Sequence, residues 1–218
     1  MTSEFLAKTE LFQGISPEEI TSILPCLNTR KVRYQKNDVI FFAGSSIHEV
    51  GLVLSGSVNI IVDFYWGNSH IFGHFEEGEL FAENYAAIPN MELPVSVLAA
   101  EDCEILFMDM QKMIHTCQKT CSPHQRLSQN LLMISARKNI HLSSRMMHTA
   151  SKSIRGRLLS YLSEQAKLHG SNKFRIPFNR QQLADYLAVD RSAMSNELSK
   201  MQKEGLIQFH KNEFHLVK

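Results

Sequence analysis

The sequence predicts an α+β fold in three parts: an antiparallel β-roll or jelly roll, a long helix, and a two-helix motif followed by a hairpin. Three observations predict it. Short apolar runs separated by turn residues recur from Arg30 to about Asp109. Helical periodicity replaces them from Ser122 onward, and two short amphipathic helices with a tight turn between them come near the end. We place the three parts at residues 1–121, 122–150 and 151–218.

The chain begins with a helical region over residues 3–28. Ser16 is suited to be a helix N-cap, and Pro17 follows it at the first helical position. Glu18 and Glu19 then supply the acids that the first turn of a helix favours. The sequence therefore predicts that a second helix starts at Pro17.

The β-region consists of short runs rich in Val, Ile, Leu and Phe. The runs are Val39–Phe42, Val50–Leu54, Val58–Val62, His70–Phe75, Val95–Ala99 and Glu104–Met108. Ser55, Gly56 and Ser57 between the second and third runs predict a hairpin, and residues 76–79 predict a turn. Small barrels of this kind commonly enclose a ligand.

Two apolar stripes mark the long helix. Leu127, Leu131 and Ile134 form one stripe, and Met133, Ile140 and Met147, spaced by seven residues, form the other. We expect one stripe to pack on the roll and the other to meet a second copy of the chain. A helix buried in its own chain would explain one stripe more easily than two.

The last part contains a helix over residues 154–169 and then two short helices over residues 179–205. Asn179 and Asp190 are the predicted N-caps of the short helices, and Gly205 ends the second. Met194, Leu198 and Met201 form the buried face of that second helix; its predicted opposite face carries Arg191, Ser192, Ser195, Asn196 and Ser199. Short polar groups without an acid suit close approach to another surface, for which a DNA major groove is the natural candidate.

The charge distribution agrees with that candidate. Residues 1–150 hold 11 Lys and Arg against 16 Asp and Glu, a balance of −5. Residues 151–218 hold 12 against 6, a balance of +6. The basic part is the one with the two-helix motif, as expected for a protein that binds phosphates. The two apolar runs after Gly205 predict a hairpin, which makes the motif a winged helix-turn-helix.

The order of these parts resembles the Crp/Fnr family of bacterial transcription factors over essentially the whole chain. The motifs that carry the resemblance are Lys36–Gly44 and Gly51–Val58 in the roll and Arg180–Ile207 in the helix-turn-helix. The resemblance implies a cytoplasmic homodimer that binds double-stranded DNA and is not an enzyme. It implies RNA polymerase as a further partner if the protein activates transcription, and it implies no membrane partner.

Seven residues are the predicted DNA contacts. Arg191 suits a bidentate contact with guanine, and Ser192 and Asn196 would complete the reading of base edges. Contacts to the DNA backbone are expected from Ser195, Lys200, Arg180 and Gln181. The family often has Gly at the position of Ala188 and a recognition arginine at the position of Asn196, so its target sequence cannot be carried over.

The resemblance also locates an effector pocket in the roll. Its predicted residues are Gly78, Glu79, Leu80, Phe81, Ala82, Glu83, Asn84, Leu93, Pro94 and Val95. In nucleotide-binding members a glutamate matching Glu83 holds the ribose, and an Arg-Ser pair holds the cyclic phosphate. That pair falls on Leu93 and Pro94, which supply neither a cation nor a side-chain donor to a buried phosphate. The sequence therefore argues against cyclic AMP or cyclic GMP and predicts no cofactor, which leaves Glu83 as either a ligand group or a residue of the barrel surface.

Other regulators and an enzyme are the remaining alternatives. The roll could hold a different effector, or none. A haem or redox sensor would use histidines or the four cysteines, Cys26, Cys103, Cys117 and Cys121. A metal-dependent cupin enzyme would use His70, His74 and Glu79. Neither a signal peptide nor a membrane-spanning apolar run is visible in the sequence.

Overall fold

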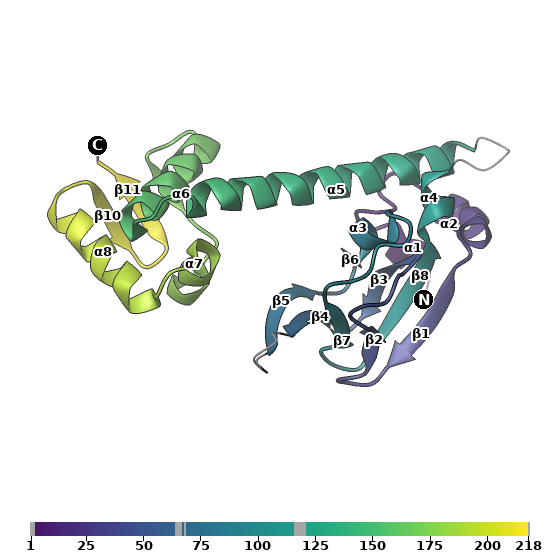
Figure 1. Cartoon of the computed structure of the whole chain (residues 1–218). Helices are drawn as coiled ribbons and strands as arrows, with labels where there is room; N and C mark the ends of the chain where they lie inside the picture. The colour runs from purple at the N-terminus through teal and green to yellow at the C-terminus, as the bar shows by residue number, and fades with distance from the viewer. Residues whose placement is uncertain (1–2, 64–66, 68, 116–120, 218) are drawn as a thin grey trace. The chain divides into compact units, whose positions relative to one another are not determined.

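The computed structural model describes residues 3–63, 67, 69–115 and 121–217. The chain divides into two compact units, Met1–Arg137 and Lys138–Lys218, and the boundary lies within one continuous helix, α5. The elements up to and including that helix are α1 (Ser3–Leu6), α2 (Pro17–Ile23), the 3₁₀ helix η1 (Leu24–Leu27), β1 (Arg30–Tyr34), β2 (Val39–Phe41), β3 (Glu49–Ser55), β4 (Val58–Asp63), β5 (Ser69–Phe75), β6 (Leu80–Phe81), α3 (Glu83–Ala86), β7 (Ser96–Ala99), β8 (Cys103–Asp109), α4 (Met110–Ile114) and α5 (Ser122–Thr149) (Figure 1).

The predicted start of α2 is confirmed in detail. The Ser16 hydroxyl accepts a hydrogen bond from the Glu19 N–H at 3.3 Å, and the Glu19 carboxylate accepts one from the Ser16 N–H at 2.9 Å. This reciprocal capping box satisfies two backbone donors that the first turn leaves free. The expected helical region is interrupted, however, because a turn separates α1 from α2.

Two antiparallel sheets form the roll. In the described residues one sheet has the strand order β1-β8-β3-β6 and the other β2-β7-β4-β5. An apolar cluster lies between the sheets, and a second cluster joins the helices to the other face of β3 and β8. Alternate residues of β3 contribute to the two clusters, with Val53 in the first and Leu52 and Leu54 in the second. This period of two explains why β3 is apolar along nearly its whole length.

The predicted hairpin between residues 50 and 62 is wrong. β3 pairs with β8 and β6, whereas β4 pairs with β5 and β7, so the two strands belong to different sheets. Gly56 between them has φ +74°, and a Cβ atom there would meet the Asp102 carbonyl. The small residues therefore form a corner that passes the chain from one sheet to the other. The local turn signal of a corner resembles that of a hairpin.

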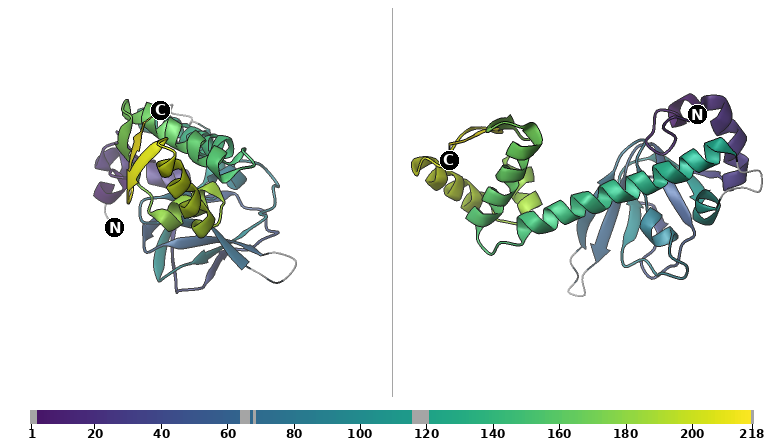
Figure 2. Two further views of the ribbon diagram at one scale, coloured as in Figure 1. Left: turned by 90° about the vertical axis from the view of Figure 1, so that its left-hand side faces the viewer. Right: turned by 90° about the horizontal axis from the view of Figure 1, so that it is seen from above.

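The two stripes of α5 differ in burial as expected. Leu127, Leu131 and Ile134 are buried in the cluster that joins the helices to the roll. Ile140 and Met147, from the other stripe, are 65% and 60% exposed. Figure 2 shows α5 as one unbroken helix. An apolar stripe thus remains uncovered along the helix.

The second unit holds the end of α5 and a three-stranded sheet, order β10-β11-β9, with three further helices among the described residues. These elements are α6 (Ile154–His169), β9 (Lys173–Arg175), α7 (Arg180–Leu187), α8 (Arg191–Lys203), β10 (Ile207–His210) and β11 (Glu213–Leu216) (Figure 1). Leu158, Leu162, Leu183, Leu187 and Leu198 lie in its core. Leu159, which follows the buried Leu158 on α6, is 40% exposed. Within the described residues, no helix is long and apolar enough to cross a membrane.

Candidate nucleic-acid interface

Two capped helices and a left-handed turn build the helix-turn-helix. The Asn179 side chain accepts a hydrogen bond from the Gln182 N–H, and the Gln182 side chain accepts one from the Asn179 N–H, both at 2.9 Å. Asp190 caps α8 by accepting from the Ala193 N–H at 2.7 Å. Hydrogen bonds from the Ser192 hydroxyl and from the Ala193 N–H hold the pKa of the Asp190 carboxyl below its usual value. Ala188, between the helices, adopts φ 52° and ψ 54°.

The faces of α8 separate as its sequence predicts. Met194, Leu198 and Met201 are fully buried. The exposed residues include Arg191, Ser192, Asn196, Ser199, Lys200 and Lys203. Lys203 was not among the predicted contacts, although its spacing of seven from Asn196 places it on the same side of the helix. The exposed side of α8 therefore carries short polar groups and cations.

The acids of α8 lie toward α6, where Arg155 binds them. The Arg155 guanidinium donates to both carboxylate oxygens of Glu204 at 2.8 Å and to Glu197 at 2.5 Å. These two pairings raise the pKa of Arg155. The negative charges of the helix are thereby paired with a cation of α6, on the flank next to Lys200.

The side chains predicted to contact the DNA backbone differ in how they are held by other groups of the protein. Lys200 is exposed, 3.9 Å from Glu197, and the Ser195 hydroxyl donates to the Arg191 carbonyl at 2.9 Å. Gln181 donates to the Asp185 carboxylate at 2.9 Å on the surface of α7. The Arg180 guanidinium lies over two aromatic rings of the terminal hairpin, 4.8 Å from the centre of Phe209 and 5.4 Å from that of Phe214. These cation–π contacts hold the guanidinium against the hairpin, and burial there lowers the pKa of Arg180.

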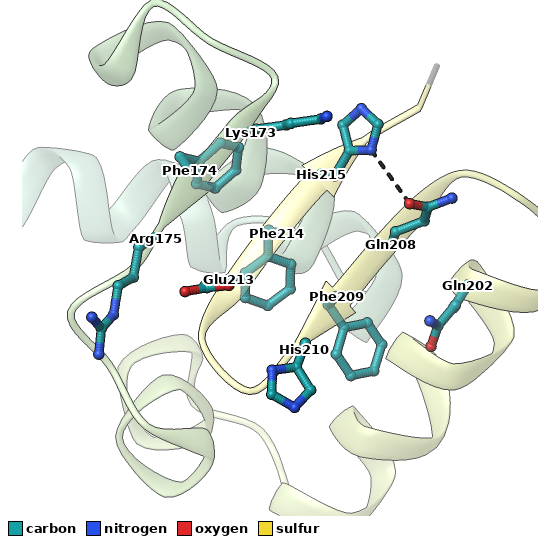
Figure 3. Close-up of a pocket in the computed structure, with 10 residues that line it drawn as sticks. All are labelled: Lys173, Phe174, Arg175, Gln202, Gln208, Phe209, His210, Glu213, Phe214 and His215. Atoms are coloured by element: carbon teal, nitrogen blue, oxygen red, sulfur yellow. Dashed lines mark hydrogen bonds between the residues drawn. The ribbon is translucent and has the colours of Figure 1, made fainter.

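The terminal hairpin and β9 form a wing with a groove beside α8. The groove has a volume of about 760 Å³, and the residues that line it are Lys173, Phe174, Arg175, Gln202, Gln208, Phe209, His210, Glu213, Phe214 and His215 (Figure 3). Cross-strand pairing aligns Lys173 with His215 and Arg175 with Glu213. Gln202 is the contribution of α8. The exposed cations Lys173 and Arg175 were missed from the sequence, although both flank the buried Phe174 in an alternating pattern.

The predicted effector-pocket residues divide into buried and exposed groups. Five of them are buried: Leu80, Phe81, Glu83, Leu93 and Val95. Glu79, Asn84 and Pro94 are exposed, and Gly78 and Ala82 are intermediate. Two cavities of the first unit, of about 530 and 490 Å³, contain none of the ten.

Backbone roles account for several of these positions. The Glu79 carboxylate accepts from the Glu76 N–H at 2.7 Å and so closes the predicted turn. Leu93 is core, and its N–H donates to the Ser45 carbonyl at 2.9 Å. A guanidinium at position 93 would enter this apolar cluster, where burying a charge without a partner is costly.

Aromatic rings fill the interior of the roll near Phe81. The ring centre of Phe81 lies 6.2 Å from that of Phe41 and 6.3 Å from that of Phe75, and Phe41 lies 5.7 Å from Phe107. Gly51 lies directly beneath the Phe81 ring, where a Cβ atom would collide with it. The lack of a side chain at Gly51 therefore lets an aromatic ring pack into the core.

The histidines, cysteines and acids singled out as candidate metal ligands lie as follows. No group of three or more His, Cys, Asp or Glu side chains that could hold a metal ion occurs in the described part of the chain. His70, His74 and Glu79 are each exposed. His74 lies 2.7 Å from the Asn59 side chain. Cys26 is exposed, Cys121 is half-buried and Cys103 is buried, and Cys117 lies outside the described residues.

Family models match both units. The model for the cyclic nucleotide-binding domain matches residues 31–120, and the model for the Crp-like helix-turn-helix domain matches residues 156–217. Electron transport regulator A of Shewanella oneidensis is 25% identical over 185 residues, which cover 82% of this chain and 71% of that protein.

Solved structures agree in fold. The catabolite activator protein of Thermus thermophilus is 21% identical, with a TM-score of 0.51 over 95% of this chain and 93% of its own. The c-di-GMP responsive global regulator CLP of Xanthomonas campestris is 20% identical, with a TM-score of 0.52 over 91% of this chain and 98% of its own. With a nucleotide-binding-type roll followed by a Crp-like helix-turn-helix, this chain belongs to the Crp/Fnr family of transcription regulators.

Proposed function

We propose that the protein is a homodimeric regulator that reads a specific DNA sequence with α8. The exposed side of that helix carries this proposal, because its acids are bound by Arg155 on another flank. Arg191 would contact guanine, and Ser192 and Asn196 would contact neighbouring base edges. Ser195, Lys200, Arg180 and Gln181, with the wing cations Lys173 and Arg175, would contact phosphates.

Selection of bound sequences from a random DNA pool tests this proposal. The selected site would then be titrated with wild-type protein and with Arg191→Ala. Loss of a bidentate contact should weaken binding about tenfold or more and relax base preference at one position. Lys167→Ala is the matched control, because it removes one exposed cation from α6 and should change affinity little. Equal affinities for wild type and Arg191→Ala would contradict the assignment.

We propose further that two chains associate through the exposed stripe of α5. Met133, Ile140 and Met147 are 55–65% exposed, and their spacing of seven residues is typical of a helix that pairs with a second helix. Such a dimer would present two copies of α8 to DNA. Its expected target is a near-palindrome with half-sites about 34 Å apart.

The oligomeric state tests this surface. Ile140→Glu places a charge in the stripe and should convert the dimer to a monomer in sedimentation experiments, with loss of tight DNA binding. His141→Glu introduces the same acid at an exposed neighbour on another side of α5 and should leave the dimer intact. A dimeric Ile140→Glu variant would rule out this interface.

We propose, finally, that the roll responds to something other than cyclic AMP or cyclic GMP. Leu93 lies in the core where the family places its phosphate-binding pair, and Pro94 offers no N–H. No Arg or Lys occurs between Glu83 and Val95. Calorimetric titration with either nucleotide should give no binding heat, and DNA affinity should not change. Saturable binding would overturn this part of the proposal and leave the DNA-binding part untouched.

A further inference from the structure

The last two turns of α5, residues 144–149, contact the helix-turn-helix directly. Arg145 donates from Nε to the Tyr186 carbonyl at 3.1 Å and from Nη2 to the Asp185 carbonyl at 3.2 Å. Its guanidinium also lies 5.7 Å from the centre of the Tyr186 ring. These carbonyls belong to the last turn of α7, where helix carbonyls lack partners within the helix and carry partial negative charge.

A second contact runs through a buried histidine. His148 Nε2 lies 2.9 Å from a Glu164 carboxylate oxygen on α6, and Nδ1 lies 2.9 Å from the Tyr186 hydroxyl on α7. The ring packs edge-on against Tyr161 at 5.4 Å. Ser144 donates to the other Glu164 oxygen at 3.1 Å. The side chain of His148 is 2% exposed, so it cannot touch DNA.

Arg157 of α6 binds the next two carbonyls of the same turn. Its guanidinium donates to the Leu187 carbonyl at 2.9 Å and to the Ala188 carbonyl at 2.8 Å. It also donates to the Ser151 carbonyl, in the loop that joins α5 to α6, at 2.8 Å. The carbonyls from Asp185 to Ala188 are thus bound by two guanidiniums, one from α5 and one from α6. Ala188 is the residue from which the chain turns into α8.

We propose that Arg145 and His148 are positioning residues for DNA binding: they make residues 144–149 of α5 part of the DNA-reading unit and hold α7 in the pose that presents α8. This inference rests on the proposed role of α8. Because hydrogen bonds fix the end of α5 to α7, a rotation of that end moves the helix-turn-helix with it.

Four variants of the full chain test the inference, one of which, Arg145→Gln, removes the charge of Arg145. Tyr186→Phe deletes only the hydroxyl that meets His148 and keeps the aromatic packing. Arg145→Lys keeps the charge but loses the planar fork that reaches two carbonyls. His148→Leu removes both polar contacts of the ring. Lys167→Gln, an exposed charge loss on α6, is the control.

The measurements are thermal unfolding, oligomeric state and affinity for the selected DNA site. We expect Arg145→Lys and Tyr186→Phe to stay folded and dimeric at the assay temperature and to bind DNA about three- to tenfold more weakly, as loss of one or two hydrogen bonds would produce. Amide hydrogen exchange at Val189 and Asp190 should accelerate in both. If His148→Leu folds, it should show the largest loss of DNA affinity among the variants.

Different outcomes separate this inference from the proposed function. Wild-type affinity and wild-type exchange in folded Tyr186→Phe and Arg145→Lys would overturn the positioning role. Full affinity in Arg145→Lys with a loss in Arg145→Gln would assign Arg145 a charge role only and would overturn its part of the inference. If wild-type protein shows no sequence preference, the proposed function itself fails.

Discussion

Two regions that carry family motifs differ in what occupies their surface. In the helix-turn-helix, residues 179–205, the polar motif residues Arg191 and Asn196 are exposed on α8. In the predicted effector pocket of the roll, residues 78–95 (the cassette), Leu93 lies in the core and Pro94 is exposed. The first region exposes polar side chains that can bind a partner. The second places an apolar side chain in the core of the protein.

A family fold and a bound ligand are separate properties of a protein. The turn closed by Glu79 and the packing of Phe81 over Gly51 stabilise the roll whether or not a ligand is present.

Placing an arginine at position 93 of the cassette should have the largest effect on stability. Leu93→Arg would bury an unpaired charge in an apolar cluster, which should lower the free energy of unfolding by about 3–5 kcal/mol. We expect the melting transition of the roll to fall sharply without any gain of cyclic AMP binding. Ile88→Arg, at an exposed apolar position in the same unit, should leave the transition nearly unchanged. A stable Leu93→Arg variant that binds cyclic AMP would show that the site is intact.

Matched substitutions of asparagine by aspartate compare the two regions at constant fold. Asn196→Asp adds a negative charge to the exposed side of α8 and should weaken DNA binding by about 1–3 kcal/mol through lost base contacts and repulsion from phosphates. Asn84→Asp makes the same change at an exposed residue of the cassette and should not alter DNA affinity. Fluorescence anisotropy at several salt concentrations would measure both. Equal effects would contradict the separation of roles.

Local sequence signals predicted the parts of the fold that depend on local chemistry. The capping residues Ser16, Asn179 and Asp190 act as expected, as does the buried face of α8. Pairing between distant strands was not predictable in this way. The small residues 55–57 read as a hairpin, and the corner at Gly56 became evident only from the β8 residues that approach it.

For the candidate site residues, too, the sequence predicted local features but not contacts between distant parts of the chain. The exposed side of α8 follows from its period, but the hold of Phe209 and Phe214 on Arg180 depends on contacts between α7 and the wing. Arg145, Arg155 and Arg157 were not singled out from the sequence. Their roles depend on carbonyls and carboxylates that are far away along the chain. Periodicity predicts which side of a helix is exposed, not which partner it meets.

The smallest predicted effect concerns two alanines, one in each unit, with left-handed backbone. Ala82 has φ 65° and Ala188 has φ 52°. Left-handed conformation costs a residue with a Cβ atom about 1–2 kcal/mol, and glycine avoids that cost. Part of the gain is lost because glycine makes the unfolded chain more flexible. Ala82→Gly and Ala188→Gly should each therefore stabilise their own unit by about 0.5–1 kcal/mol.

Calorimetry resolved into separate transitions would measure the two gains, because a chain with two units need not unfold in one step. Ala193→Gly, within the right-handed turns of α8, is the opposite-sign control and should destabilise by about 1 kcal/mol. The comparison also separates stability from binding. If the left-handed turn at Ala188 serves only to connect α7 to α8, Ala188→Gly should raise the melting temperature with DNA affinity unchanged. A fall in affinity would mean that the stiffness of alanine at this turn contributes to holding α8 in the pose that binds DNA.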